Sequence, residues 1–216
     1  MMNATGSFLG YDPGGDGNHG VAVLRVDAGK PSSVEVTTLQ TAEDALRFFE
    51  RQRNGPAIGI DTLTCWSTGP GGWCPADRWL RENYPKVRNS VVTPNGLFGS
   101  MGLNGPSVLL TLRNATPCLM ATETHPKVLH WHFSNERYDF LGHHDRMNAL
   151  LARLLHLAIT VITEHAWDAA ISACAAYMGY VREWSLDLHD EYRFRPAENE
   201  RIVSPCGQTH YFWPSA

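Results

Sequence analysis

The apolar positions of the first 40 residues form short alternating runs instead of a helical stripe. Apolar runs at residues 8–11, 20–26 and 33–39 are separated by turn-rich segments, the longest of which spans residues 12–20. Runs of this kind, bounded by Gly, Pro, Asn and Asp, predict β-strands. Connections this short join antiparallel neighbours. The pattern therefore predicts an antiparallel meander of three strands.

Residues 41–60 predict a helix followed by a fourth strand. A start like a capping box at Thr41 and an apolar stripe through Leu46 and Phe49 predict a helix as far as about Arg53. Residues 57–60 are almost wholly apolar, which is typical of a buried parallel strand. The helix therefore acts as a crossover, and we expect the fourth strand to lie parallel to the first and beside it.

Residues 62–116 break this pattern. They contain many glycines and prolines, three tryptophans and an excess of basic residues. We expect one helix to start near Pro75, because proline suits the first helical position, and a second short helix at residues 107–113. We interpret the segment as a Gly/Trp-rich insert.

The second half of the chain supplies a fifth strand and two helices. Residues 119–122 form the strand, and the leucine pattern from about Asp145 to Ala158 predicts a helix. Thr163 ends a β-branched interruption and is a suitable N-cap for a second helix over residues 164–180. The tail at residues 185–216 is polar and irregular.

Together these elements predict one α/β domain over residues 1–216. Its core would be a five-stranded mixed sheet in the strand order 3-2-1-4-5, with helices on both faces. The sequence shows no internal repeat and no linker between domains. A chain of this length is long enough to bury a sizeable core.

Composition narrows the functional classes. The chain has 216 residues and a net charge of −4, which argues against a generic nucleic-acid coat protein. An enzyme that meets nucleic acid through a local groove remains compatible with this charge. No apolar run is long enough to cross a bilayer, and no signal peptide is recognisable at the start. We therefore expect a cytoplasmic protein without a membrane partner.

The cysteines are scattered, and no C-x-x-C pair occurs among them. This pattern disfavours a zinc ribbon or a disulfide framework, and it fits reduced thiols in the cytosol. The five residues are Cys65, Cys74, Cys118, Cys174 and Cys206.

Four acidic residues stand at positions where the predicted fold would bring them together. Asp12, Asp61 and Glu123 each follow one of the apolar strand runs, and Asp168 precedes the apolar part of the last helix. Carboxylates at the C-terminal ends of such strands point into the crevice where open α/β sheets bind ligands. Converging like charges cost energy unless cations neutralise them. The pattern therefore predicts a metal site.

The order of elements and these acids resemble the ribonuclease-H-like superfamily. More narrowly, the chain resembles domain-of-unknown-function family 429, described as predicted RNase H-like nucleases. The resemblance covers most of the fold up to about residue 180. It rests on Gly10-Tyr-Asp12-Pro-Gly-Gly, Gly59-Ile-Asp61, Glu123-Thr-His-Pro126 and Asp168-Ala-Ala-Ile-Ser-Ala.

The resemblance implies a metal-dependent nuclease acting on DNA or RNA. All four acids would be catalytic metal ligands for two Mg²⁺ or Mn²⁺ ions, since hard oxygen ligands suit these cations better than zinc. Carboxylates spread beyond about 10 Å could not share such a two-metal centre. The spread of the four carboxylates in the structure therefore distinguishes the nuclease hypothesis from the alternative, a non-catalytic interaction protein that keeps the same fold.

Each acid also has a purely structural interpretation. Asp12 could organise a turn, Asp61 could cap a loop, and Glu123 could form a surface ion pair. Asp168 could simply stabilise a helix dipole. Glu164, one turn before Asp168, is a reserve ligand, although a solvated surface charge is the more ordinary role.

Two histidines stand near the predicted site. His125 and His165 could assist proton transfer, although packing is the more ordinary role for both.

The insert offers candidate contacts to a nucleic acid. Tryptophans beside basic residues can stack bases and hold phosphates. The candidates are Arg78, Arg81, Arg88, Trp66 and Trp73. The alternative is a flap whose tryptophans pack on the sheet.

A second enzyme class shares the same strand order. The loop at residues 13–20 resembles the phosphate-binding turn of the actin and sugar-kinase fold, which implies nucleotide phosphoryl transfer. Enzymes of that group normally need two such domains, and this chain has room for one. It also lacks the Lys-Ser/Thr of a P-loop.

Overall fold

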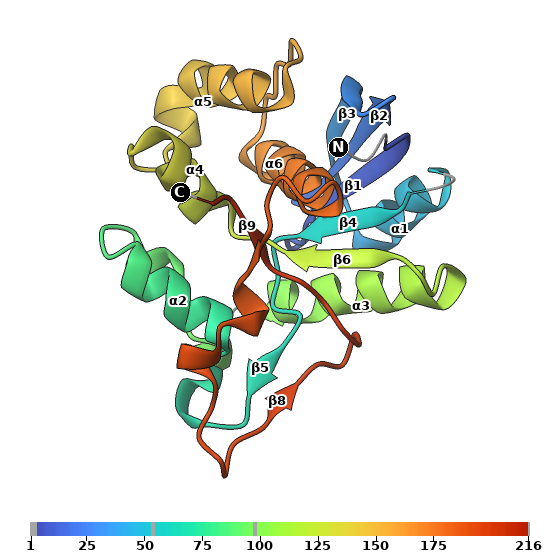
Figure 1. Ribbon diagram of the computed structural model, residues 1–216. Helices are drawn as coiled ribbons and strands as arrows, with labels where there is room; N and C mark the ends of the chain where they lie inside the picture. Colours follow the sequence, from blue (N-terminus) through green and yellow to red (C-terminus); the bar gives the residue numbers. More distant parts are fainter. Residues whose placement is uncertain (1–3, 53–54, 97–98, 216) are drawn as a thin grey trace.

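A computed structural model describes residues 4–52, 55–96 and 99–215 of the chain. Its main sheet has five strands in the order β3-β2-β1-β4-β6 (Figure 1). β1 pairs antiparallel with β2, which pairs antiparallel with β3, while β4 is parallel to both β1 and β6. The predicted fold class and strand order are confirmed. The strands are β1 (Gly6–Asp12), β2 (His19–Asp27), β3 (Lys30–Leu39), β4 (Ala57–Ile60) and β6 (Met120–Glu123).

Helices cover both faces of the sheet, as predicted (Figure 1). Successive strand residues alternate between two cores. Phe8 of β1 packs in one core with α6, whereas Leu9 and Tyr11 pack in the other with α1 and α3. The helices are α1 (Ala42–Glu50), α2 (Pro75–Asn83), α3 (Gly99–Ala115), α4 (Pro126–Ser134), α5 (Phe140–Leu155) and α6 (Glu164–Tyr180).

Helix α6 lies unusually close to the sheet because three adjacent strands present glycine to it. A Cβ at any of these glycines would overlap a backbone carbonyl oxygen of the helix. The helix itself is rich in buried alanine, whose short side chains allow the close approach. This packing sets how far the helix projects past the strand ends. The pairs are Gly10 with Ala169, Gly20 with His165, and Gly59 with Ser172.

Some helix boundaries differ from the prediction. Helix α3 is longer than the predicted 107–113, because buried Val108, Leu109 and Leu112 hold it against the sheet although Pro106 lies inside it. Helix α5 begins five residues earlier than Asp145, at a start that Asp139 caps through the Gly142 N–H at 3.0 Å.

The prediction for α6 and its N-cap is confirmed. Thr163 Oγ1 accepts a hydrogen bond from the Ala166 N–H at 3.2 Å. Helix α1 ends at Glu50; its predicted end near residue 53 lies outside the described residues.

The predicted insert and the predicted tail pack against each other. Strand β5 (Trp66–Ser67) of the insert pairs with β8 (Ile202–Val203) of the tail, and Trp213 Nε1 donates to Tyr84 Oη at 2.8 Å. Figure 1 shows α2, β5 and β8 as a lobe beyond the carboxyl ends of the parallel strands. The remaining short elements are β7 (Leu186–Asp187), β9 (Phe212–Trp213), η1 (Pro70–Gly72), η2 (Arg88–Ser90), η3 (Pro94–Gly96), η4 (Leu188–Asp190) and η5 (Tyr192–Phe194).

The tail also extends the edge of the main sheet. His210 bridges Thr122 in parallel, and the Glu123 N–H donates to the His210 carbonyl oxygen at 2.7 Å. The tail is thus irregular, as predicted, but tied to β6. Within the described ranges, every helix is too short or too polar to cross a membrane.

Candidate metal centre

Three of the four predicted acids meet at one end of the sheet. Asp12, Asp61 and Asp168 each offer one carboxylate oxygen, and these oxygens all lie within 4.8 Å of one another. Asp12 is the last residue of β1, Asp61 follows β4, and Asp168 lies in the second turn of α6. The Asp61 N–H continues the ladder by donating to the Tyr11 carbonyl oxygen at 2.9 Å, which holds the two strand ends side by side.

Burial makes this cluster electrostatically costly. Asp12 and Asp168 are only 5% and 3% exposed, while Asp61 is the more open of the three. Burial, followed by the charge of Asp12, holds the pKa of Asp61 and that of Asp168 well above the ordinary value. Burial also raises the pKa of Asp12. A divalent cation would offset the cost of burying these charges and their mutual repulsion.

His165 contacts the cluster directly. Its Nδ1 lies 2.6 Å from Asp12 Oδ2, and its side chain is 35% exposed. The hydrogen bond to Asp12 raises the pKa of His165. The sequence pointed to His165 through its distance of three residues from Asp168, but not to Asp12 as its partner.

Two further residues at the site were not predicted. Tyr138 Oη donates to Asp168 Oδ1 at 2.7 Å, and Lys127 Nζ lies 5.4 Å from the centre of the Tyr138 ring. Burial alone would lower the pKa of Lys127, but Asp168, Glu164 and Asp61 outweigh it and the net shift is upward. Lys127 lies four residues after Glu123, at the start of α4, so its position near a strand end could have predicted it. No feature of the sequence predicts Tyr138 at the site.

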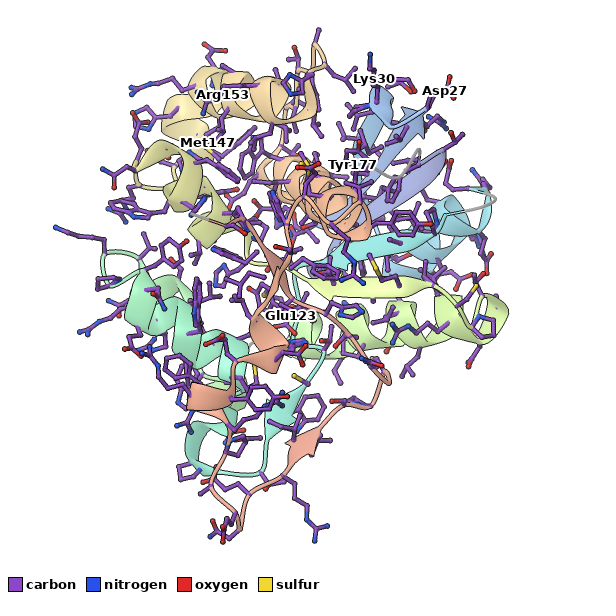
Figure 2. The ribbon with its side chains drawn as sticks, viewed as in Figure 1. Asp27, Lys30, Glu123, Met147, Arg153 and Tyr177 are labelled. Carbon is purple, nitrogen blue, oxygen red and sulfur yellow. The ribbon has the colours of Figure 1, made fainter. Side chains whose placement is uncertain are left out.

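Glu123 is not brought into the three-carboxylate group. It is buried, and its Oε2 accepts hydrogen bonds from the Thr64 N–H at 2.8 Å and from Thr64 Oγ1 at 2.9 Å. His189 Nε2 lies 3.6 Å from the same oxygen. Figure 2 labels Glu123 where the sheet meets the lobe formed by the insert and the tail. Thr64 draws the carboxylate toward the insert, and its role as a fourth ligand stays a prediction.

The other predicted candidates near the acids, Glu164 and His125, have local partners. Glu164 Oε1 pairs with Lys127 Nζ at 3.5 Å. His125 Nε2 donates to the Ser90 carbonyl oxygen at 3.1 Å, and burial lowers the pKa of His125 to about 4. At neutral pH this histidine is therefore uncharged.

Two adjoining pockets open beside the cluster. A pocket of about 210 Å³ is lined by Asp61, Glu123 and Lys127, among other residues. A larger one of about 710 Å³ has basic and aromatic walls together with the acids Asp139 and Glu164, and it shares Ser90 and Lys127 with the first. The basic and aromatic residues that line the larger pocket are Lys86, Lys127, Arg137, Trp131, Tyr138 and Phe140.

The predicted substrate contacts of the insert are not gathered around these pockets. Arg81 Nη1 donates to the carbonyl oxygens of Arg88 and Val91, each at 2.8 Å, and the guanidinium covers the Trp73 ring at 4.9 Å. Arg81 and Trp73 therefore stabilise the insert itself.

The remaining three candidates differ in their surroundings. The Arg88 side chain is exposed. Arg78 is half-buried, and its Nε has no hydrogen-bond partner among the described residues. Trp66 lines a separate pocket beside Leu63 and Leu103. Their part in substrate binding stays a prediction.

Comparison of the chain with known protein families and with curated proteins found no match. The narrower resemblance to domain-of-unknown-function family 429 is therefore not confirmed. Among solved structures, the chain is similar to Thermus thermophilus RuvC, with a TM-score of 0.45 and 13% identity over 81% of this chain and 95% of that one. A structure of T. thermophilus RuvC in complex with a Holliday junction substrate gives a TM-score of 0.47 and 15% identity, covering 81% and 93%. At these identities the similarity is one of fold alone. The strand order of the sheet establishes that fold without the comparison.

Proposed function

We propose that the chain is a metal-dependent nuclease that hydrolyses phosphodiester bonds of a nucleic acid. Asp12, Asp61 and Asp168 would hold Mg²⁺ or Mn²⁺, with Glu123 as a fourth acid that adds negative charge beside them. The observation that carries this proposal is the convergence of three carboxylate oxygens, from three separate elements, to within 4.8 Å of one another. That spacing is well inside the limit of about 10 Å for a shared two-metal centre.

The donor set fits hard divalent cations. All three groups are carboxylates, and oxygen ligands favour Mg²⁺ and Mn²⁺ over softer metals. When bound, such ions lower the pKa of an attacking water and stabilise the charge of the leaving oxygen. No covalent nucleophile from the chain is then required.

The neighbouring residues would orient the acids and attract the substrate. His165 contacts one oxygen of Asp12, and Tyr138 donates to one oxygen of Asp168. The second oxygen of each carboxylate would then bind the cation. Lys127 keeps a positive charge beside the cluster and lines both pockets. A cation there is suited to a phosphate oxygen next to the scissile bond.

The larger pocket is the best candidate path for the nucleic-acid chain. Lys86 and Arg137 are exposed cations on its wall, and Trp131 offers an aromatic face. Cations that follow a backbone and aromatic faces that stack bases are the common features of strand-binding grooves. Arg88, two residues after Lys86, would extend this surface.

The direct test is hydrolysis by wild type and Asp12→Asn with Mg²⁺, Mn²⁺ or EDTA. The substrates are single-stranded and duplex DNA, RNA, an RNA–DNA hybrid and a four-way junction. Asp16→Asn, an exposed acid in the adjoining loop, is the matched control. We expect metal-dependent cleavage by wild type and Asp16→Asn and none by Asp12→Asn. Cleavage by a folded Asp12→Asn protein would contradict the assignment.

The same preparations separate the alternatives. A non-catalytic interaction protein would bind one of these nucleic acids, or none, and cleave none of them with either metal. A phosphoryl-transfer enzyme would consume ATP without cleaving a phosphodiester. Either result in cleanly folded wild-type protein would replace the nuclease proposal.

A further inference from the structure

A second group of metal-binding side chains lies apart from the three aspartates. Cys65, Cys74 and His189 each offer one ligand atom, and these atoms all lie within 4.8 Å of one another. Both thiols are buried and free of disulfides. Cys65 and Cys74 both lie in the insert, whereas His189 lies 124 positions after Cys65, so the fold brings the histidine to the two cysteines.

The spacing of two of these atoms matches a tetrahedral metal ion. Cys65 Sγ lies 3.6 Å from His189 Nε2. Ligands at about 2.3 Å (sulfur) and about 2.05 Å (nitrogen) from zinc, at a tetrahedral angle, are themselves about 3.6 Å apart. An ion can therefore enter between them without a change in their separation.

The histidine ring is also oriented for metal binding. His189 Nδ1 lies 3.1 Å from the Thr209 carbonyl oxygen. A carbonyl only accepts, so Nδ1 must carry the proton in this contact. In the neutral form of the ring, Nε2 then carries the lone pair and lies beside the sulfurs. A backbone carbonyl that fixes the tautomer is the usual support for a metal-ligating histidine.

From these contacts we propose that Cys65, Cys74 and His189 bind a zinc ion. Thiolate and imidazole ligands select zinc over Mg²⁺ or Mn²⁺, which the carboxylate centre would take. Two thiolates and a neutral imidazole balance the charge of one Zn²⁺, and the thiol protons leave to solvent on binding. Three protein ligands leave one position of a tetrahedral ion for a further ligand.

The ion would fasten the insert to the tail. Cys65 precedes β5, Cys74 is the N-cap of α2, and His189 lies in η4. His189 is also next to Glu123, which binds Thr64 of the insert. Zinc at this position would therefore fix the lobe that borders the smaller pocket. This inference does not depend on the proposed nuclease activity.

The competing arrangement uses the same residues without a metal. A protonated His189 would place a second N–H at Nε2 and pair with Glu123, while both cysteines stayed as thiols. This form binds no soft metal, so metal content and spectroscopy of the full chain distinguish the two arrangements.

The experiment is titration of reduced, metal-free protein with Co²⁺ and then Zn²⁺. We expect one Co²⁺ per chain with the intense sulfur-to-cobalt charge-transfer absorption of thiolate ligands, and its loss as Zn²⁺ displaces Co²⁺. We also expect the Tm to rise by about 5 to 10 °C at free zinc about a hundredfold above its Kd. X-ray absorption of the zinc-loaded wild type should show two sulfur ligands, and it needs no variant.

Matched variants locate the ion. Cys65→Ser, Cys74→Ser and His189→Gln should each weaken or abolish the cobalt absorption. Cys118→Ser, at an exposed cysteine, and Cys174→Ser, at a buried one, should retain it. Asp12→Asn should retain it too, because the carboxylate centre supplies no sulfur. No charge-transfer absorption in the wild type, or full absorption in Cys65→Ser, would overturn the proposal.

Discussion

His165 Nδ1 lies 2.6 Å from Asp12 Oδ2 and joins the first turn of α6 to the end of β1. The two residues are 153 positions apart in the sequence. The contact exists because Gly20 lets the backbone of His165 approach β2 more closely than any side chain would permit. The close packing of α6 on β2 at Gly20 therefore orients Asp12 of the candidate metal centre.

Removing this histidine should weaken metal binding and activity without unfolding the protein. We expect His165→Ala to lower Mn²⁺ affinity and cleavage by about 10 to 100-fold, the usual effect of removing a partner that orients a metal ligand. The pH profile of cleavage should also shift, and His165→Asn should restore part of the activity. His144→Ala, at an exposed histidine of α5, is the control. An unchanged pH profile and affinity would show that the contact is only structural.

Manganese should stabilise the wild type through the aspartates. A cation that binds only the folded state adds roughly 2.7 kcal/mol to the free energy of unfolding at a hundredfold excess over its Kd. We expect Asp61→Asn to abolish the Mn²⁺-induced rise in Tm and Glu123→Gln to reduce it by less. Exposed Asp145→Asn should keep the full rise. Equal rises in wild type and Asp61→Asn, measured by thermal melts, would count against the whole metal site.

Without metal, the cluster should make the protein less stable as pH rises. The folded-state pKa values of Asp61 and Asp168 lie well above 3.8, so the folded protein keeps protons that the unfolded chain has released. The free energy of unfolding then falls with increasing pH above about pH 4, until the folded-state pKa values are passed. Asp61→Asn removes one such group and should show a shallower fall in denaturant titrations with EDTA from about pH 5 to 8.

The comparison with the variant cancels the contribution of histidines that both proteins share. His19 and His125 have lowered pKa values and change stability in the opposite direction. Parallel pH dependences in wild type and Asp61→Asn would contradict the raised pKa of Asp61. Mn²⁺ should stabilise the wild type more at higher pH, because binding requires ionised carboxylates.

The close approach of α6 to the sheet should tolerate no side chain at Gly59. A Cβ there overlaps the Ser172 carbonyl oxygen, so the helix must shift. We expect Gly59→Ala to lower the free energy of unfolding by about 1 to 3 kcal/mol and to impair metal binding, because Asp168 moves with the helix. Gly15→Ala, where a Cβ would meet open space, is the control. Equal denaturation midpoints for both variants would refute the packing argument.

The walls of the larger pocket should contribute to nucleic-acid binding through charge. Replacing Lys86 and Arg137 together with Ala should weaken binding and flatten its salt dependence, by about one unit of slope for each phosphate that the protein no longer neutralises. Adding Arg88→Ala should flatten the slope further. Arg201→Ala, at an exposed arginine of the tail, should leave it unchanged. A wild-type slope in the double variant would place the nucleic acid elsewhere.

The sequence by itself determined the sheet and the positions of the acids. Period-two runs, a helical crossover and an almost wholly apolar fourth strand predicted the order that the structure shows. These signals are local, because side-chain alternation and turn residues follow from the geometry of a single strand. Parallel strands share one carboxyl edge, so Asp12 and Asp61 had to end near each other. Thr163 likewise predicted the start of α6, which placed Asp168.

Only the tertiary structure decided which side chains share a site. Glu123 stands at a strand end as expected, yet its carboxylate oxygen is held by Thr64 and does not join the group of three aspartates. Tyr138 reaches Asp168, and His189 reaches Cys65 from more than a hundred residues away. Sequence spacing carries no information about such contacts. The contacts of Glu123 and His189 arise when the insert and the tail fold onto the carboxyl edge of the sheet. The contact of Tyr138 arises when the segment between α4 and α5 packs on α6. In both cases long-range packing, not local pattern, sets the position of the side chain.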